Sequence, residues 1–181
     1  MNNKVLIIGL QWPEPNATAA GTRMMQLIRF FLEQDDHVTF ATAAPKSDLS
    51  MDLSGLSVVS KGIQLNHSGF DVFIKDLDPA IVIFDRFLAE EQYGWRVSEA
   101  CPKAVRILDT EDLHFLRKAR ETALAKNSQD INLHLKNDTT LREIASIYRC
   151  DLSLVISKFE EEMLLNHFTI PPALILYLPF L

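Results

Sequence analysis

The sequence predicts an α/β fold: a single domain with a doubly wound, Rossmann-like parallel sheet and helices on both faces. Uninterrupted apolar runs at residues 5–8 and 81–84 are typical of strands buried on both sides. Segments with helical spacing of apolar residues stand between such runs. This alternation implies right-handed crossovers within one parallel sheet. The length of 181 residues fits one domain, residues 1–181.

Composition narrows the class of protein further. With 48% hydrophobic and 23% charged residues, the chain can bury a core, which excludes a disordered class. The net charge of −6 disfavours binding to nucleic acid. Cys101 and Cys150 form no CxxC pair, and the five histidines show no ligand spacing. We therefore expect no metal, no cofactor and a cytoplasmic location.

The first half of the chain predicts strands and helices in strict alternation. Apolar residues at 24, 27, 28, 31 and 32 form one stripe of a helix, and Pro79 ends a later one. In order we expect a strand at 5–8, a helix at 23–33, a strand at 38–41, a helical turn at 51–56, a weak strand at 63–65, a helix at 70–77 and a strand at 81–84.

The second half continues the alternation. Pro102 terminates one helix, and Ser157 with Glu160 three residues later matches a capping box, which predicts that a helix begins there. We expect a helix at 87–100, a strand at 104–108, a helix at 113–126, a loop at 127–136, a helix around 141–148, a strand at 152–156, a helix from 157 to about 167 and a final strand at 174–178.

Polar residues follow several of these strands. In open parallel sheets, ligands bind outside the carboxyl ends of the strands, where the strand order reverses. The loop after Gly9, the Asp85-Arg86 pair, residues 109–112 and the Ser157-Lys158 pair would lie on that rim. We therefore expect a binding crevice there. Helix capping explains Asp85, Asp112 and Ser157 without any ligand, and for each one singly it is the favoured explanation.

The first loop carries the most information. Residues 17–22 are all small and precede the first helix, so N–H groups of its first turn would be accessible to an anion or a sugar hydroxyl. Arg23 would add a positive charge. The alternative is a loop kept small for close packing of helix and sheet. Neither a P-loop nor a Gly-x-Gly-x-x-Gly pattern occurs.

Together these segments resemble the N-terminal domain of a GT-B glycosyltransferase. The resemblance is carried by the strand at 4–9, the loop ending AGTR at 20–23, Asp85-Arg86 after the fourth strand, and the strand ends at 105–110 and 152–157. More narrowly, the chain looks like bacterial family 4-like enzymes of cell-wall, capsule or lipopolysaccharide synthesis. The order of elements matches along the whole chain.

The resemblance implies transfer of a sugar from a nucleotide-sugar donor to a hydroxyl of a glycan or lipid-linked acceptor. This domain would hold mainly the acceptor, and a second domain, absent from residues 1–181, would bind the donor. The chain alone would then be inactive. By resemblance, backbone amides of Ala20, Gly21 and Thr22 would contact donor diphosphate or acceptor, with Arg23 and Arg86 beside them.

The end of the fifth strand holds the candidate for catalysis. Enzymes of this family often carry His before Thr there, whereas this chain has Asp109-Thr110. Asp109 would be a general base supported by Glu111 or Asp112, since clustered carboxylates raise one another's pKa. A strand-end Asp that caps the next turn is the alternative, and a retaining enzyme would need no base.

Two tryptophans are aromatic candidates for stacking on a sugar ring. Trp12 lies in the rim loop and is the better carbohydrate candidate, whereas Trp95 has the helical spacing of a core residue. Arg117, Lys118 and Arg120 would form a solvated helix face, and weak peripheral contact with an anionic membrane is the alternative.

A second class of function fits the same elements. The chain would then be a non-catalytic Rossmann-like or flavodoxin-like module that binds a small ligand or a protein partner. A following domain with a paired-glutamate motif would favour the transferase.

Overall fold

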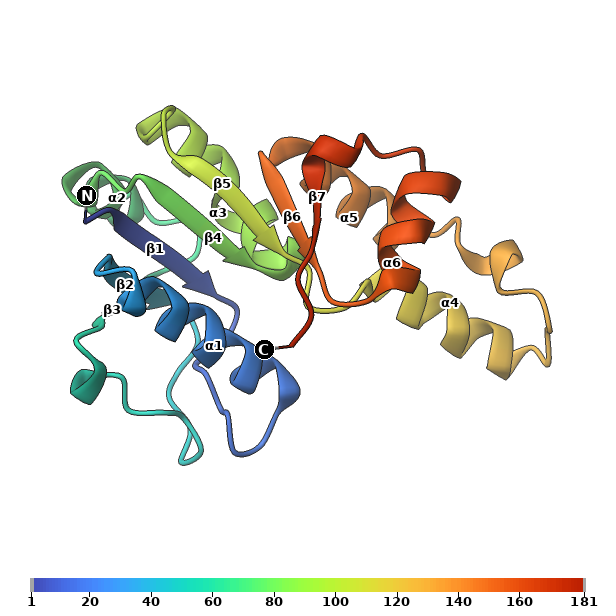
Figure 1. The fold of residues 1–181 in the computed structure, drawn as a ribbon, viewed down its shortest axis with the longest axis horizontal. Helices are drawn as coiled ribbons and strands as arrows, with labels where there is room; N and C mark the ends of the chain where they lie inside the picture. Colours follow the sequence, from blue (N-terminus) through green and yellow to red (C-terminus); the bar gives the residue numbers. More distant parts are fainter. Residues whose placement is uncertain (1, 181) are drawn as a thin grey trace.

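The computed structural model describes residues 2–180, and over that range it contains a seven-stranded, fully parallel sheet (Figure 1). The strand order is β3-β2-β1-β4-β5-β6-β7, which confirms the predicted doubly wound α/β fold. The strands are β1 (Lys4–Gly9), β2 (His37–Thr42), β3 (Val59–Gly62), β4 (Ile81–Asp85), β5 (Val105–Asp109), β6 (Leu152–Val155) and β7 (Ile175–Tyr177).

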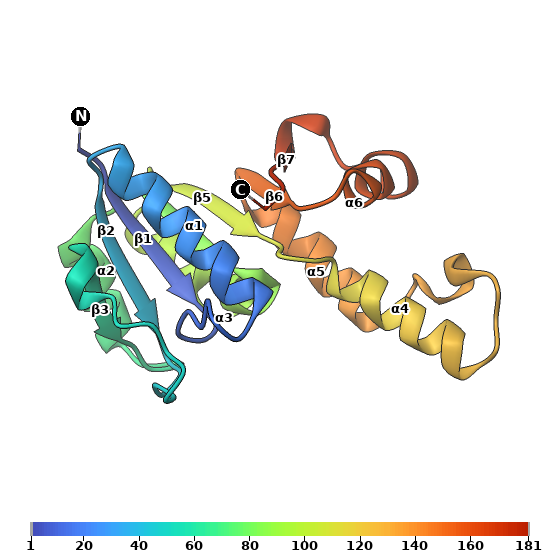
Figure 2. The same ribbon diagram turned by 60° about the horizontal axis from the view of Figure 1, so that its bottom comes forward.

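Helices cover both faces of the sheet, and alternate residues of β1 separate the two cores. Val5 and Ile7 pack against the first helix, whereas Leu6 and Ile8 belong to the larger core on the opposite face (Figure 2). The helices are α1 (Ala19–Glu33), α2 (Gly69–Leu77), α3 (Arg86–Ala100), α4 (His114–Ala125), α5 (Asp138–Arg149) and α6 (Lys158–Glu162).

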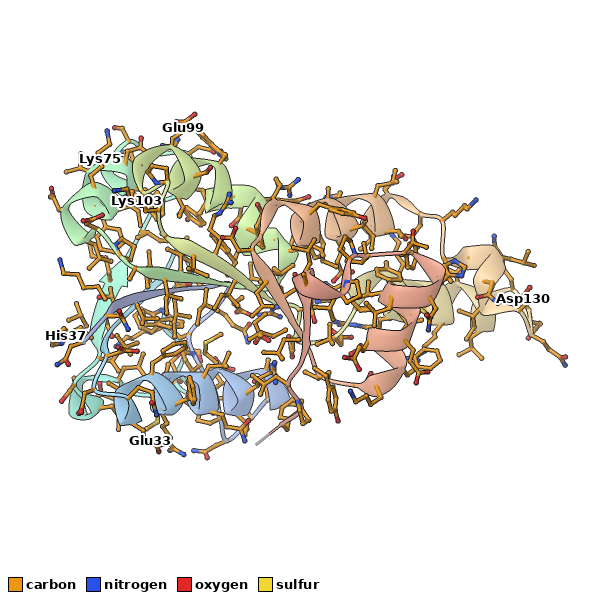
Figure 3. The ribbon with its side chains drawn as sticks, turned by 45° about the horizontal axis from the view of Figure 1, so that its top comes forward. Glu33, His37, Lys75, Glu99, Lys103 and Asp130 are labelled. Carbon is orange, nitrogen blue, oxygen red and sulfur yellow. The ribbon has the colours of Figure 1, made fainter. Side chains whose placement is uncertain are left out.

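Four short helical turns complete the structure. Three are 3₁₀ turns and one is a π-helix that continues α6 directly; they are η1 (Ser54–Leu56), η2 (Ile131–His134), η3 (the π-helix, Met163–His167) and η4 (Pro172–Leu174). α4 and η2 form an arm that extends away from the sheet (Figure 1). Asp130 lies at the far end of the arm, and Glu33 and His37 lie at the opposite end of the molecule (Figure 3).

Most predicted elements agree with the structure to within a few residues, and three differ. The weak strand expected at 63–65 lies instead at Val59–Gly62, as an edge strand whose residues are all exposed. The loop expected at 127–136 contains η2. The capping box is confirmed in part, because the Ser157 side chain accepts a hydrogen bond from the Glu160 N–H, but the helix changes to π geometry after Glu162.

Candidate functional site

The strand order reverses between β1 and β4, whose carboxyl ends lie side by side. The carboxylate of Asp85, at the end of β4, accepts a hydrogen bond of 2.9 Å from the Leu10 N–H just after β1. Asp85 makes no side-chain capping bond to α3, so the capping explanation is wrong for this residue. Its side chain instead fixes the first loop at the point where α/β sheets bind ligands.

Arg86 and Glu111, two predicted binding residues, meet at this rim. Arg86 donates to both carboxylate oxygens of Asp85, at 3.0 and 3.1 Å, and its Nη1 lies 3.4 Å from Glu111 Oε2. Both residues are left-handed, with φ of 67° and 61°. Six other described residues that are not glycine are left-handed as well, so this conformation alone does not mark a ligand site. Burial raises the pKa of Glu111, and the charge of Arg86 opposes that shift.

The first turn of α1 is already hydrogen-bonded. The Gly21 N–H donates to Thr18 Oγ1 at 2.9 Å, and the Thr22 N–H donates to the Thr18 carbonyl at 3.1 Å. The expectation of bare donors is therefore wrong for both residues. Thr18 is the N-cap of α1, and a capping side chain takes up the amide that an anion would otherwise bind.

Gly21 has a packing role. A Cβ atom added there would lie 2.4 to 2.5 Å from backbone atoms of Glu14, so only glycine lets the loop cross this closely. This supports the packing alternative for the small-residue loop. Ala20, Gly21 and Arg86 nevertheless line one small depression beside Asp85, together with Trp12.

Arg23 and Asp109 form a buried ion pair instead of lining an open crevice. Arg23 Nε donates to Asp109 Oδ1 at 2.8 Å and Oδ2 at 3.1 Å, Nη2 lies 2.7 Å from Oδ1, and each side chain is 2% exposed. Burial raises the pKa of Asp109, while Arg23 opposes the shift. The expectation that Arg23 offers a charge to a ligand is wrong, because Asp109 occupies it.

The buried guanidinium also holds the segment after β7. Arg23 Nη1 donates to the Leu178 carbonyl at 2.9 Å, and the ring of Phe180 lies 5.8 Å from the guanidinium carbon. Arg23 thus connects β5 with Leu178, which lies 155 residues after Arg23 in the chain.

Neither tryptophan side chain has the exposure that we expected. Trp12 is only 7% exposed, its ring packs on Phe40 with centroids 5.5 Å apart, and its N–H donates to the Ala44 carbonyl. Lys46 covers the ring as well, at 4.8 Å from the centroid, so Trp12 is a core residue without an open face for a sugar. Trp95, expected in the core, is 50% exposed.

Two buried glutamates close to the rim have a role that sequence reasoning missed. Glu143 of α5 accepts hydrogen bonds from the His114 N–H at 3.2 Å and the Phe115 N–H at 3.0 Å. Glu160 of α6 accepts one from the Leu113 N–H at 3.0 Å. Together they cap the start of α4, where the helix dipole favours negative charge. One feature of the sequence could have indicated that Glu143 is buried: it lies one helical turn before Ile147, on the same face of the helix.

Glu143 makes stability depend on pH. Burial raises its pKa to about 8, against the two N–H groups that lower it, so the folded protein holds this proton more tightly than the unfolded chain. The free energy of unfolding should therefore fall as the pH rises from about 4.5 to about 8. In the wild type this fall in the free energy of unfolding should be on the order of a few kcal/mol, and Glu143→Gln should remove it.

Urea unfolding of both proteins at several pH values between about 5 and 9 measures this decline. Asp138→Asn, on the same helix but exposed, is the control. Identical pH slopes for the wild type and Glu143→Gln would contradict the assignment.

The rim also contains a group that could hold a metal ion. Among the residues described, ligand atoms of Glu111, Asp112 and His114 all lie within 4.8 Å of one another. Burial lowers the pKa of His114, which favours the neutral imidazole that metals bind. However, Arg117 binds Asp112 at 2.5 Å and Arg86 approaches Glu111, so guanidinium groups already neutralise the carboxylates. We therefore propose no metal there.

Comparisons with known proteins are informative at the level of fold. No family model and no curated protein sequence matches the chain. A sucrose-phosphate synthase of Thermosynechococcus elongatus superimposes with a TM-score of 0.66 at 13% identity, covering 98% of this chain and 48% of that one. An NAD-dependent epimerase/dehydratase of Methylobacillus flagellatus gives 0.52 at 13%, covering 87% and 55%.

These likenesses establish a Rossmann-like α/β domain. More particularly, the fold is like that of about half of a sucrose-phosphate synthase chain. The chain spans about half the length of the solved chains it matches. In residues 2–180, no helix is long and apolar enough to cross a membrane.

Proposed function

We propose that the chain is the acceptor-side half of a GT-B glycosyltransferase, which moves a sugar from a nucleotide sugar to a hydroxyl of a glycan or lipid-linked acceptor. The main support is the match of 98% of this chain to about half of a sucrose-phosphate synthase. A donor-binding domain would supply the other half. The finer assignment to a bacterial family 4-like enzyme of cell-envelope synthesis remains part of the proposal.

Arg86 and Glu111 are the residues we place nearest to the substrate. They are half-buried, they come from the ends of neighbouring strands, and the β1–β4 reversal lies beside them. Arg86 can donate to a sugar or phosphate oxygen, and Glu111 can accept from a hydroxyl. Ala20, Gly21 and Thr22 shape the adjoining loop.

Asp109 fits a positioning role better than the role of general base. A base must come within hydrogen-bond reach of the proton it removes, and both oxygens of Asp109 face Arg23 in a buried pair. In the proposed enzyme, Asp109 and Arg23 would hold α1 against β5 and so keep the rim in shape. If a separate general base acts, Glu111 is the more accessible carboxylate.

Titration of the ¹⁵N-labelled chain with UDP-glucose and GDP-mannose tests the proposal. Without a donor domain we expect weak binding, in the millimolar range, with shifts near residues 10–23, 85–86 and 110–112. Arg86→Ala should abolish them, whereas Arg29→Ala, on the exposed face of α1, should not. Micromolar binding by the isolated chain would contradict the division between two domains.

The second candidate is the non-catalytic binding module, and the neutralised Arg23–Asp109 pair favours it. A chain whose strand-end carboxylate is already paired can bind a ligand without carrying out chemistry on it. Rim shifts that survive Arg86→Ala would contradict the proposed contact of Arg86 with the nucleotide sugar and would favour this module.

A further inference from the structure

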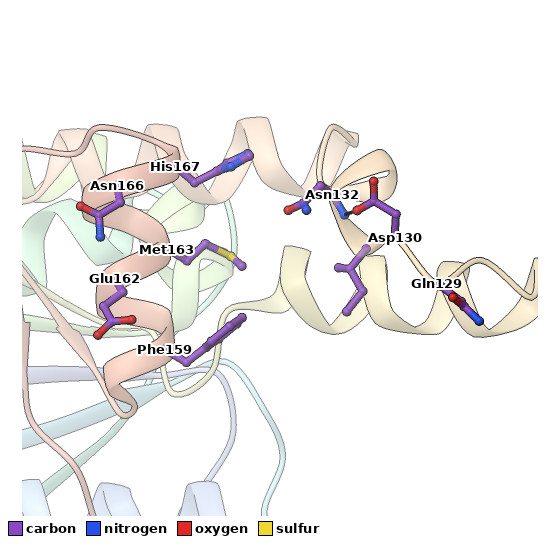
Figure 4. A pocket seen from close by; sticks show the side chains of 9 residues that line it. Gln129, Asp130, Asn132, Phe159, Glu162, Met163, Asn166 and His167 are labelled. Carbon is purple, nitrogen blue, oxygen red and sulfur yellow. Dashed lines mark hydrogen bonds between the residues drawn. The ribbon is translucent and has the colours of Figure 1, made fainter.

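A second region with binding chemistry lies away from the rim, between the arm and α6. It is a groove of about 440 Å³ with one wall from residues 129–132 of the arm and the other from α6 and η3 (Figure 4). Its volume falls within the roughly 300–1,000 Å³ of small-molecule sites. Its apolar lining residues are Ile131, Phe159 and Met163.

The groove combines an apolar surface with uncharged and acidic polar groups. Phe159 is 53% exposed, and Ile131 and Met163 are half-buried beside it. Asn132 and Asn166 line the groove from opposite walls, and the side chains of Met163 and His167 point toward the arm, whereas that of Asn166 does not (Figure 4). None of the nine described residues that line the groove is a lysine or an arginine.

The π-helix η3 forms part of the wall that also contains Phe159. A π turn is wider than an α turn, and such segments occur frequently at functional sites. η3 contributes Met163, Asn166 and His167 to the same wall as Phe159. Arg120, outside the lining, lies over one face of the Phe159 ring with its guanidinium 5.5 Å from the centroid, and Phe159 is still 53% exposed.

We propose that this groove binds a neutral saccharide of two or three sugar units. A pyranose ring has an apolar C–H face that can pack on an exposed aromatic ring, and its hydroxyls both donate and accept hydrogen bonds. Side-chain amides can donate and accept such hydrogen bonds, and carboxylates can accept them. A saccharide can bind here whether or not the rim takes part in sugar transfer, so the site goes beyond the proposed function.

The charge of the groove disfavours anionic ligands. Asp130 and Glu162 are the acidic residues of the lining and Arg120 lies beside it over Phe159, so these three groups have no net positive charge that would attract a phosphate or a nucleoside diphosphate. An acidic surface lacks the attraction that an anionic lipid needs. An uncharged, hydroxyl-rich ligand fits both the charge and the exposed ring.

The test is a ¹⁵N chemical-shift titration of the chain with maltotriose, cellotriose, mannotriose and triacetylchitotriose, and with inorganic phosphate as the anionic probe. We expect at least one trisaccharide to shift amides of residues 129–132 and 159–167 with a Kd of about 0.1–10 mM. Phosphate should not shift them. Because rim and groove resonances are separate, failure of one proposal is distinguishable from failure of the other.

Variants of exposed residues make the test specific. Phe159→Ala should weaken binding about tenfold, since stacking on aromatic rings contributes on the order of 1 kcal/mol. Tyr148→Ala is the matched control, because Tyr148 is also 53% exposed but lies on α5 outside the groove. No groove shifts with any trisaccharide, or shifts that survive Phe159→Ala, would overturn the proposal.

Discussion

Replacing Arg23 by methionine should lower the free energy of unfolding by about 3–5 kcal/mol, because the change leaves Asp109 buried without its partner. It also removes the donor to the Leu178 carbonyl. Without Arg23, burial and the charge of Asp85 raise the pKa of Asp109 further, opposed by the hydrogen bond from the Glu111 backbone. Asp109 should therefore take up a proton as the pH falls, and the deficit should shrink toward acidic pH.

Urea unfolding at about pH 5 and pH 7 measures the loss and its pH dependence. Arg29→Met, on the exposed face of the same helix, should change stability by less than about 0.5 kcal/mol. The double variant Arg23→Met with Asp109→Leu should recover much of the stability, since it leaves no unpaired charge. A loss below about 1 kcal/mol in Arg23→Met would show that the pair is not buried as described.

Gly21→Ala should destabilise the protein by about 1–3 kcal/mol, although alanine is the better helix former. The added methyl would overlap the backbone of Glu14, which cannot rotate away as a side chain could. Either α1 or the loop must move, and the depression beside Arg86 should change shape with it. Thermal unfolding measures the stability, and amide shifts of residues 10–23 report the movement.

Gly55→Ala and Gly62→Ala are matched controls for this change. A Cβ atom at either position meets nothing within 4 Å, so both variants should lie within about 0.5 kcal/mol of the wild type. A gain of stability in Gly21→Ala would indicate that the loop does not pass so close to the helix.

The sequence was sufficient to predict the sheet and the place of the rim, because apolar runs and helical stripes are local patterns. The sequence could not predict the pairing of Arg23 with Asp109, because the two residues are 86 positions apart. Taken alone, each looks like a charged residue of the rim. Thr18 was equally ambiguous: its capping bond to Gly21 determines whether an amide is available, and a run of small residues does not reveal it.

The other misses have the same kind of cause. Trp12 lies in the rim loop by sequence, but its burial depends on Phe40 of β2 and on the carbonyl of Ala44. Cooperation between Glu143 and Glu160 requires that α5 and α6 both reach the start of α4. The π turn at Met163 has no sequence pattern comparable to a capping box.

The capped start of α4 has a mechanical consequence. Its first turn follows Glu111 by three residues, while its far end leads into the wall that carries Asp130. Glu143 of α5 and Glu160 of α6 accept hydrogen bonds from that turn, so the start of α4 is held by two neighbouring helices. These hydrogen bonds therefore join the segment just after Glu111 to α5 and α6.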